Sequence, residues 1–457
     1  MKQSVENFLN RHCINPDSID MDYLVSQFLN DMRLGLAGKK SSLAMIPSYC
    51  SVDAKPKKGE SVIVIDAGGT NLRTCLVTFG SSASGSAEDL SPVISDFKKS
   101  SMPGVKKEVS ASEFFSILAD EVERLIDKSD RIGFCFSYAV EILPDHDGIP
   151  VLLSKEVKAP EIIGKRLGKG LMEELGRRGH DVSKKKILIL NDAVATLLAG
   201  QSRNINGPFD SCVGFILGTG TNTSYVEKTR RIGKLKGLGI GDEGYQIINV
   251  ESGNMSVSLG DLDREFLDGT VEPSRYMFEK MISGAYLGPL ARVVLGAAVR
   301  EGLFSAKFGE CFEKLTSLST IEVSEFLDEE SGFESVEREW TRSGASVDSG
   351  NVLQMCCGGN EEDYDTLMDI LGCFIERAAK LTAANLASAV LITNFGKDED
   401  HPVLINADGT TFYRTAYLRS YTTEYLEAYL AEKGRRAVLT RIEDSPIIGS
   451  AIGALTL

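Results

Sequence analysis

The stretch Ile63-Val64-Ile65-Asp66-Ala67-Gly68-Gly69-Thr70-Asn71-Leu72-Arg73 runs from an apolar segment into a turn of small residues. The apolar part predicts a buried strand that ends at Asp66. Gly68 and Gly69 permit a positive φ and the close approach of a ligand, while Thr70 adds a hydroxyl and Arg73 adds donors suited to phosphate. The stretch therefore predicts a phosphate cradle with a carboxylate at its mouth. An ordinary β-hairpin, in which the glycines serve only the turn, explains the same residues.

Two later stretches repeat this pattern. Residues 212–217 form an apolar run that leads into Gly218-Thr219-Gly220-Thr221-Asn222 and returns as residues 223–227. Residues 403–406 lead into Ala407-Asp408-Gly409-Thr410. The repeat of strand, Gly/Thr turn and return strand predicts two similar half-domains that each offer a phosphate turn.

Composition limits the possible functions. The chain has 457 residues, enough for two or three domains, and 42% hydrophobic with 25% charged residues is normal for a soluble globular protein. The formal net charge of -15 argues against nucleic acid or an anionic membrane as a partner.

The nine cysteines are scattered without Cys-x-x-Cys spacing, and there are four histidines. This pattern predicts neither a zinc site nor a disulfide framework. Residues 1–17 lack the apolar core of a signal peptide, and no apolar run is long enough for a membrane helix. We therefore expect a cytoplasmic protein in a reducing compartment.

The periodicity of the chain alternates between helix and strand. Apolar residues at helical spacing predict helices over 20–36 and 363–390, and a lysine-rich connector at 51–60 marks a domain boundary. The strand predicted at 186–190 ends at Asn191-Asp192, directly before a helical segment. Asp192 suits a helix N-cap there, and this is also where open α/β sheets bind ligands.

One further motif matches a dinucleotide fingerprint. Residues 239–244 read Gly-Ile-Gly-Asp-Glu-Gly, but a basic segment precedes them where the fingerprint requires an apolar strand. We interpret the match as accidental.

In chain order, these stretches resemble the hexokinase family of sugar kinases from about residue 20 onward. The resemblance rests on Asp66 to Arg73, Phe134-Cys135-Phe136-Ser137-Tyr138, Ser154-Lys155, Asn191-Asp192, residues 217–222, residues 241–251, residues 278–284 and residues 286–288. It implies an α/β actin-like ATPase (ribonuclease H-like) fold with two domains around a central cleft. The small domain would comprise residues 58–190 plus 445–457, and the large domain residues 1–57 plus 191–444.

The resemblance also implies a reaction, in which the γ-phosphate of MgATP passes to the 6-hydroxyl of a hexose, glucose first, giving hexose 6-phosphate and ADP. Asp192 would be the general base, with Lys155 beside the reacting oxygen. The implied sugar-binding residues are Ser137, Ser154, Lys155, Asn191, Asp192, Asn222, Glu251 and Glu279. The implied nucleotide-binding residues are Asp66, which would hold Mg²⁺ through water, with Gly68, Gly69, Thr70, Asn71, Arg73, Thr219, Gly220, Asp408, Gly409, Thr410, Gly449 and Ser450.

The sequence departs from the family pattern at three places. The family's Trp-Thr-Lys is Leu153-Ser154-Lys155, its His-Pro after Asp-Gly-Thr is Thr415-Ala416, and its Gly-Ser-Gly-Lys-Gly is residues 449–453. These departures leave the nucleotide preference open. The sequence makes no prediction of the oligomeric state. Alternative functions are an acetate-kinase-like phosphotransferase, a non-catalytic sugar sensor on the same fold and, from the 239–244 match alone, a nicotinamide-dependent enzyme.

Overall fold

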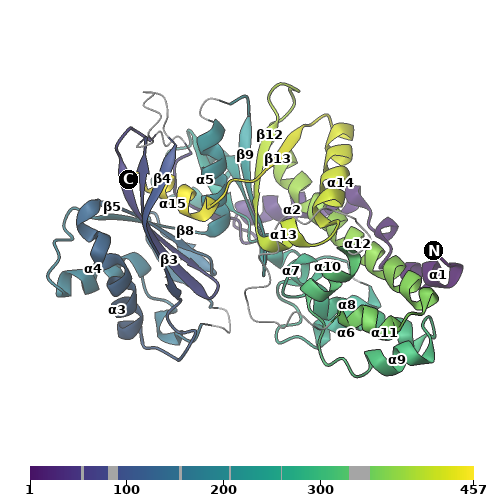
Figure 1. The fold of residues 1–457 in the computed structure, drawn as a ribbon. Coiled ribbons are helices and arrows are strands. Elements are labelled where there is room, and N and C mark those ends of the chain that lie inside the picture. The colour runs from purple at the N-terminus through teal and green to yellow at the C-terminus, as the bar shows by residue number, and fades with distance from the viewer. Residues whose placement is uncertain (53–55, 81–90, 154–156, 205–206, 259, 329–349) are drawn as a thin grey trace.

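The computed structural model of the chain describes residues 1–52, 56–80, 91–153, 157–204, 207–258, 260–328 and 350–457. In this part of the chain, two large mixed sheets stand side by side with helices packed on their faces (Figure 1). A third, two-stranded sheet pairs β6 with β7. The architecture is therefore α/β, as the sequence predicts.

The first large sheet has five strands in the order β4-β3-β2-β5-β8. Strands β2, β3 and β4 are antiparallel neighbours, whereas β5 and β8 run parallel to β2. The organising stretch forms β2 and the start of β3, with Gly68 opposite Asn71 across the turn. The bounds are β2 Ser61–Gly68, β3 Asn71–Phe79, β4 Pro92–Ser101, β5 Arg131–Phe136, β6 Val140–Ile142, β7 Gly148–Pro150 and β8 Lys186–Leu190.

The second large sheet has six strands in the order β1-β11-β10-β9-β12-β13. Its centre is the antiparallel β9–β10 hairpin, and β12 joins β9 in parallel. The bounds are β1 Ile46–Pro47, β9 Ser211–Leu217, β10 Thr221–Lys228, β11 Tyr245–Asn249, β12 Val403–Asp408 and β13 Ala437–Thr440.

Both faces of β2 are buried, because its apolar residues run without interruption. Ile63 and Ile65 pack with the helices α3 and α4 on one side. Val62 and Val64 pack on the other side with α5 and α15, which lie between the two sheets (Figure 1). The bounds of these helices are α3 Ala111–Val122, α4 Leu167–Arg177, α5 Asp192–Asn204 and α15 Ser445–Ala454.

The remaining helices pack around the second sheet and beyond it. The 33-residue helix α12 is buried along much of its length and forms one core with α2 and α14. The helices predicted at 20–36 and 363–390 are confirmed as α2 and α12. The bounds are α1 Gln3–Arg11, α2 Met21–Leu36, α6 Asp261–Asp268, α7 Met277–Ile282, α8 Leu287–Arg300, α9 Ala306–Phe312, α10 Thr320–Asp328, α11 Val352–Cys357, α12 Glu361–Thr393, α13 Thr410–Arg414 and α14 Leu418–Glu432.

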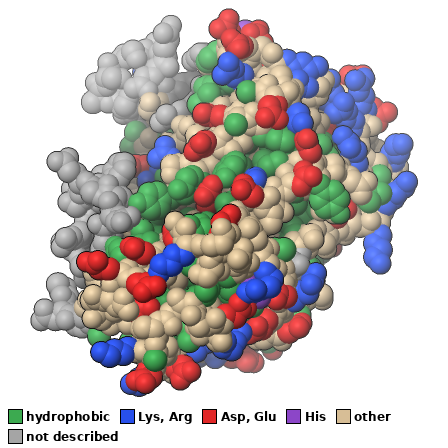
Figure 2. All heavy atoms as spheres, turned by 90° about the vertical axis from the view of Figure 1, so that its right-hand side faces the viewer, with side chains coloured by type: hydrophobic (Ala, Val, Ile, Leu, Met, Phe, Trp, Pro, Cys, Tyr) green, Lys and Arg blue, Asp and Glu red, His purple; other side chains and the backbone are tan. Residues whose placement is uncertain are grey.

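The charge of the surface and the length of the apolar helices relate to the expectation that neither nucleic acid nor a membrane is a partner. On the face that Figure 2 shows, acidic and basic side chains both lie among hydrophobic ones, so this face is mixed in charge. Among the described residues, no helix combines the length and the apolar character needed to span a membrane. The domain boundaries near residues 58, 190 and 445 and the cytoplasmic location stay predictions.

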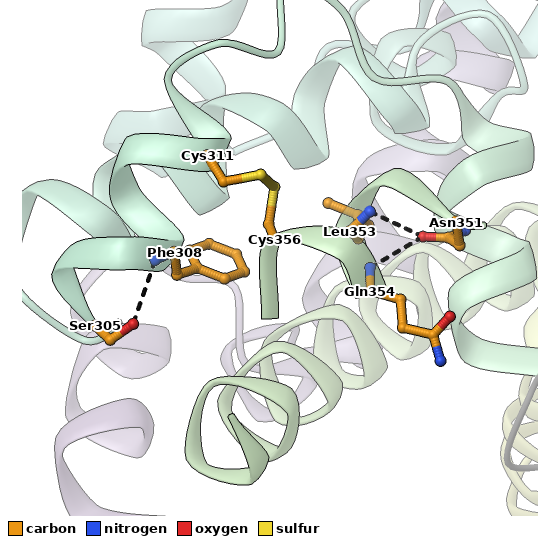
Figure 3. Close-up of a disulfide and its surroundings, with 7 residues drawn as sticks. All are labelled: Ser305, Phe308, Cys311, Asn351, Leu353, Gln354 and Cys356. Carbon is orange, nitrogen blue, oxygen red and sulfur yellow. Dashed lines mark hydrogen bonds between the residues drawn. A yellow bond between two sulfur atoms is a disulfide. The ribbon is translucent and has the colours of Figure 1, made fainter. Parts of the chain in front are cut away.

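The cysteine pattern led to a wrong expectation. Cys311 on α9 and Cys356 on α11 form a disulfide with a Cα–Cα distance of 5.2 Å (Figure 3). Both helices have side-chain caps that fix their starts: Ser305 accepts from the Phe308 N–H, and Asn351 accepts from the Leu353 N–H. The pairing follows from the packing of α9 against α11, which cysteine spacing does not reveal.

Removing this disulfide is expected to lower the free energy of unfolding by about 4 kcal/mol, because it closes a loop that spans 45 residues. Denaturant unfolding of Cys311→Ser and of the parent, both without reductant, measures the difference. Cys373→Ser is the control, since Cys373 is a free cysteine. Equal unfolding midpoints for the parent and Cys311→Ser would contradict the expectation.

Candidate active site

Asp192 is the first residue of α5 and is separated from β8 by Asn191 alone, so the sheet fixes its position. Its Oδ1 accepts from the Ala193 N–H at 2.8 Å, and Asn191 Oδ1 accepts from the same N–H at 2.8 Å. The capping role expected from the sequence is therefore shared, and Asn191 also accepts from Asn222 Nδ2 at 3.1 Å. This contact joins the end of β8 to β10 of the other sheet.

The environment of Asp192 suits a base that works near neutral pH. Burial raises the pKa of Asp192 to about 6, although hydrogen bonds from Ser137 and the Ala193 N–H oppose the shift. The charges of Glu251 and Asp66 raise it further. A carboxylate with this pKa is mostly ionised at pH 7 and is more basic than an exposed aspartate.

Glu279 on α7 lies against the second Gly/Thr turn. Its Oε2 accepts from the Thr221 N–H at 2.9 Å, and a Cβ on Gly220 would lie 2.5 Å from that same oxygen. Burial raises the pKa of Glu279 to about 7, opposed by the Thr221 hydrogen bond and increased by the charge of Glu251. Gly220 is therefore needed to admit the carboxylate.

Glu251 completes the acidic group. Burial raises its pKa, and hydrogen bonds from Asn249 and Asn222 oppose that shift. Asp192, Glu251 and Glu279 are each half-buried. The charge of Glu251 raises the pKa of both Asp192 and Glu279, and the charge of Asp192 raises the pKa of Glu279. Clustered carboxylates accept hydrogen bonds but donate none when ionised, so they suit a neutral ligand rich in hydroxyl groups.

The first predicted phosphate turn, Gly69 and Thr70, is the exposed tip of the β2–β3 hairpin. Gly69 has a φ of 52°, and its carbonyl accepts from the Tyr138 hydroxyl. The Thr70 carbonyl accepts from the Met102 N–H at 2.9 Å. The turn is thus a hairpin, as the simpler interpretation expects, and its carbonyl groups are held from behind while its tip is open.

Asp66 lies buried below this tip. Burial raises its pKa, the nearby charge of Arg73 lowers it, and the charges of Asp408 and Asp444 raise it. Arg73 Nε is 3.0 Å from Asp66 Oδ2 without hydrogen-bond alignment, and Oδ2 has no hydrogen-bond donor among the described residues. A buried carboxylate oxygen without a donor fits a bound cation or its water ligand.

The second and third turns are interlocked. Gly218 O accepts from the Gly284 N–H at 2.9 Å and from Thr411 Oγ1 at 2.8 Å. Gly409 has a φ of 115°, and a Cβ there would lie 2.2 Å from Leu217 O. Glycine is therefore required at 409, and the exposed Thr219 and Thr410 lie on neighbouring turns.

Two predicted nucleotide-binding residues take part in helix packing. Gly449 and Ser450 lie buried inside α15, and the Ser450 hydroxyl donates to Pro446 O at 2.6 Å. A Cβ on Gly449 would lie 1.7 Å from Ala195 O of α5. This packing accounts for both residues through the crossing of α15 and α5, and their assignment to the nucleotide stays a prediction.

Other predictions have separate outcomes. Ser154 and Lys155 lie outside the described residues. Residues 239–244 precede the strand β11 instead of opening a helix, which agrees with an accidental match to the dinucleotide fingerprint. Sequence reasoning missed Asp444, which precedes α15 and whose charge raises the pKa of Asp66, and Asn249, which donates to Glu251. The polar residue at the end of the apolar β11 was the signal for Asn249.

Comparison with known proteins identifies the family. Two family models, both described as hexokinase, match residues 4–202 and 212–456. Hexokinase-1 of Rattus norvegicus is 27% identical over 382 residues, which is 79% of this chain and 40% of the relative. Hexokinase-4, chloroplastic, of Oryza sativa subsp. japonica is 26% identical over 446 residues, which is 92% of this chain and 82% of the relative. The chain thus spans about two fifths of the length of the rat and mouse relatives it matches.

Solved structures show the same fold. A hexokinase from Schistosoma mansoni complexed with glucose matches with a TM-score of 0.72 at 22% identity, over 100% of this chain and 99% of that one. A second structure, a crystal structure of hexokinase, matches with a TM-score of 0.73 at 20% identity, over 100% of both chains. The predicted actin-like ATPase fold is confirmed. The family models, the relatives and the fold agree that this chain belongs to the hexokinase family.

Proposed function

We propose that the protein phosphorylates the 6-hydroxyl of a hexose with MgATP, with glucose as the preferred hexose and Asp192 as the general base. The observation that carries the proposal is the group of Asp192, Glu251 and Glu279, brought together from α5, the end of β11 and α7 beside two Gly/Thr turns. Membership of the hexokinase family supports a hexose as the substrate.

Each member of the group has a distinct task. Asp192 accepts the proton of the attacking hydroxyl, and its pKa of about 6 leaves it ionised at pH 7. Glu251 and Glu279 accept hydrogen bonds from other hydroxyl groups of the sugar. A missing or misdirected hydroxyl leaves a buried group unpaired at a cost of roughly 1–3 kcal/mol, so mannose and fructose are expected to be weaker substrates.

The described residues fit MgATP at the other end of the site. Asp66, with a buried oxygen that lacks a hydrogen-bond donor, would hold Mg²⁺ through water, and Arg73 with the turns at Gly68–Asn71, Thr219–Gly220 and Asp408–Thr410 would hold the phosphates. Bound magnesium neutralises phosphate charge and orients the phosphates. Ser154 and Lys155 keep the sugar-binding roles proposed from the sequence.

A coupled assay of ADP release tests the function. Purified protein with MgATP is given glucose, mannose, fructose, acetate or no acceptor, and glucose is expected to give the highest kcat/KM. Release with acetate but not with hexoses would favour an acetate-kinase-like enzyme. Calorimetric binding of glucose without ADP release would favour a sugar sensor, and binding of a nicotinamide cofactor in its place would favour an oxidoreductase.

A further inference from the structure

Asn249, the last residue of β11, lies between two residues of the sugar site. Its Oδ1 accepts from Asn222 Nδ2 at 2.8 Å, and its Nδ2 donates to Glu251 Oε1 at 2.8 Å. One orientation of the amide satisfies both neighbours, because Asn222 presents hydrogens there and an ionised Glu251 presents none. Only 4% of Asn249 is exposed, so water does not replace these contacts.

The backbone at Glu251 is strained, which makes its support important. Glu251 has a φ of 58°, a left-handed conformation that a residue with a side chain seldom adopts. Asn222 Oδ1 accepts from the Glu251 N–H at 3.1 Å, and Asn249 holds the same Asn222 amide from the other end. Asn249 therefore acts on both the backbone and the side chain of Glu251.

The network is anchored in the core behind the site. Asn385, in the middle of α12, donates to Thr223 Oγ1 at 2.7 Å, and Ser252 Oγ donates to the same oxygen at 3.2 Å. Thr223, Ser252 and Asn385 are each at most 2% exposed. A rigid helix thus fixes the segment on which Glu251 stands.

We propose that Asn249 is a positioning residue of the hexose site: it holds Glu251 Oε1 and leaves Glu251 Oε2 to a sugar hydroxyl. Asn222 Nδ2 also lies 3.2 Å from this Oε1, but it shares its two hydrogens among three acceptors, so Asn249 is the shorter and undivided donor to Glu251. The proposal rests on the hexose kinase function proposed above, and it adds a residue that does not itself touch the substrate.

Asn249→Asp tests the proposal without a change of shape. The new carboxylate faces Glu251 Oε1, so two ionised groups repel each other at high pH, whereas one shared proton restores the hydrogen bond at lower pH. The hexose KM is expected to rise about 10- to 100-fold at pH 8 and to recover most of this loss at pH 6, while the KM for ATP changes less than about threefold.

Other ionisable groups face this site, so the parent is measured at the same pH values and each KM of the variant is divided by that of the parent. These groups are Asp192 on α5, Glu279 on α7, Tyr276 before α7 and Lys280 beside Glu279. Asn406→Asp is the matched control. Asn406 is a fully buried amide on β12 that donates to Thr196 O and Ser445 Oγ, so this variant tests the general effect of burying a carboxylate.

The outcomes separate the two proposals. A hexose KM for Asn249→Asp that follows the parent at both pH values, or a loss equal to that of Asn406→Asp, would overturn the positioning role. If the Asp variant fails to fold by circular dichroism, Asn249→Ser replaces it, and a hexose KM unchanged in that variant would likewise overturn the role. A parent that neither binds glucose by calorimetry nor phosphorylates any hexose would overturn the proposed function, and this inference with it.

Discussion

Replacing Asp192 with alanine is expected to lower kcat by roughly 10²- to 10⁴-fold while glucose binding survives, because a general base acts mainly on the transition state. Initial rates and calorimetric titration with glucose measure the two effects. Asp20→Ala is a matched control, since Asp20 also stands at a helix N-terminus, where it accepts from the Tyr23 N–H of α2. In that control the free energy of unfolding is expected to fall by about 1 kcal/mol, and kcat is expected to stay as in the parent.

The same role predicts a pH dependence. The pKa of Asp192 is about 6, so kcat/KM in the parent is expected to rise between pH 5 and pH 7 as the carboxyl loses its proton. Glu279, with a pKa of about 7, titrates in the same site, so the apparent values belong to the group of acids. Near-normal kcat in correctly folded Asp192→Ala would show that Asp192 is not the general base.

Glu279→Gln is expected to raise the hexose KM by about 10- to 100-fold and to leave the KM for ATP nearly unchanged. The amide oxygen of glutamine can keep the Thr221 N–H, but its NH₂ group then presents donors to a sugar hydroxyl that needs an acceptor. Steady-state kinetics with each substrate varied in turn measure both constants.

Glu272→Gln serves as the control for this variant, because Glu272 is an exposed acid nearby that pairs with Arg275. It is expected to leave both constants as in the parent. Equal shifts of the two KM values in Glu279→Gln, or fructose used better than glucose by the parent, would show that the sugar site is assigned incorrectly.

The sequence predicts strand ends, helix starts and turns, because neighbouring residues determine them. The strand that ends at Asp66, the helix that starts at Asp192 and the three Gly/Thr turns were visible because burial pattern, capping and turn chemistry act over a few residues. The packing role of Gly449 was not predicted, because a glycine that lies against a phosphate and a glycine that lies against Ala195 O look the same in a sequence.

Contacts between distant segments were beyond this reasoning. The disulfide joins residues 45 positions apart, and nothing in the spacing of the nine cysteines selects Cys311 and Cys356. Asn249 shows the same limit, since an asparagine at a strand end is unremarkable until Asn222 and Glu251 are placed on either side of it.

The position of α15 between the sheets sets an order of events on the ribosome. Ile447, Ala451 and Ile452 cover one face of β2 and β5, yet they are translated about 320 residues after β5. At a translation rate of ~5–20 residues per second, α15 is synthesised roughly 15–60 s after β5, and this face of the sheet lacks the helix until then. During this interval Val62, Val64 and Cys135 are without part of their final packing, so the nascent chain exposes apolar surface on this face of the sheet.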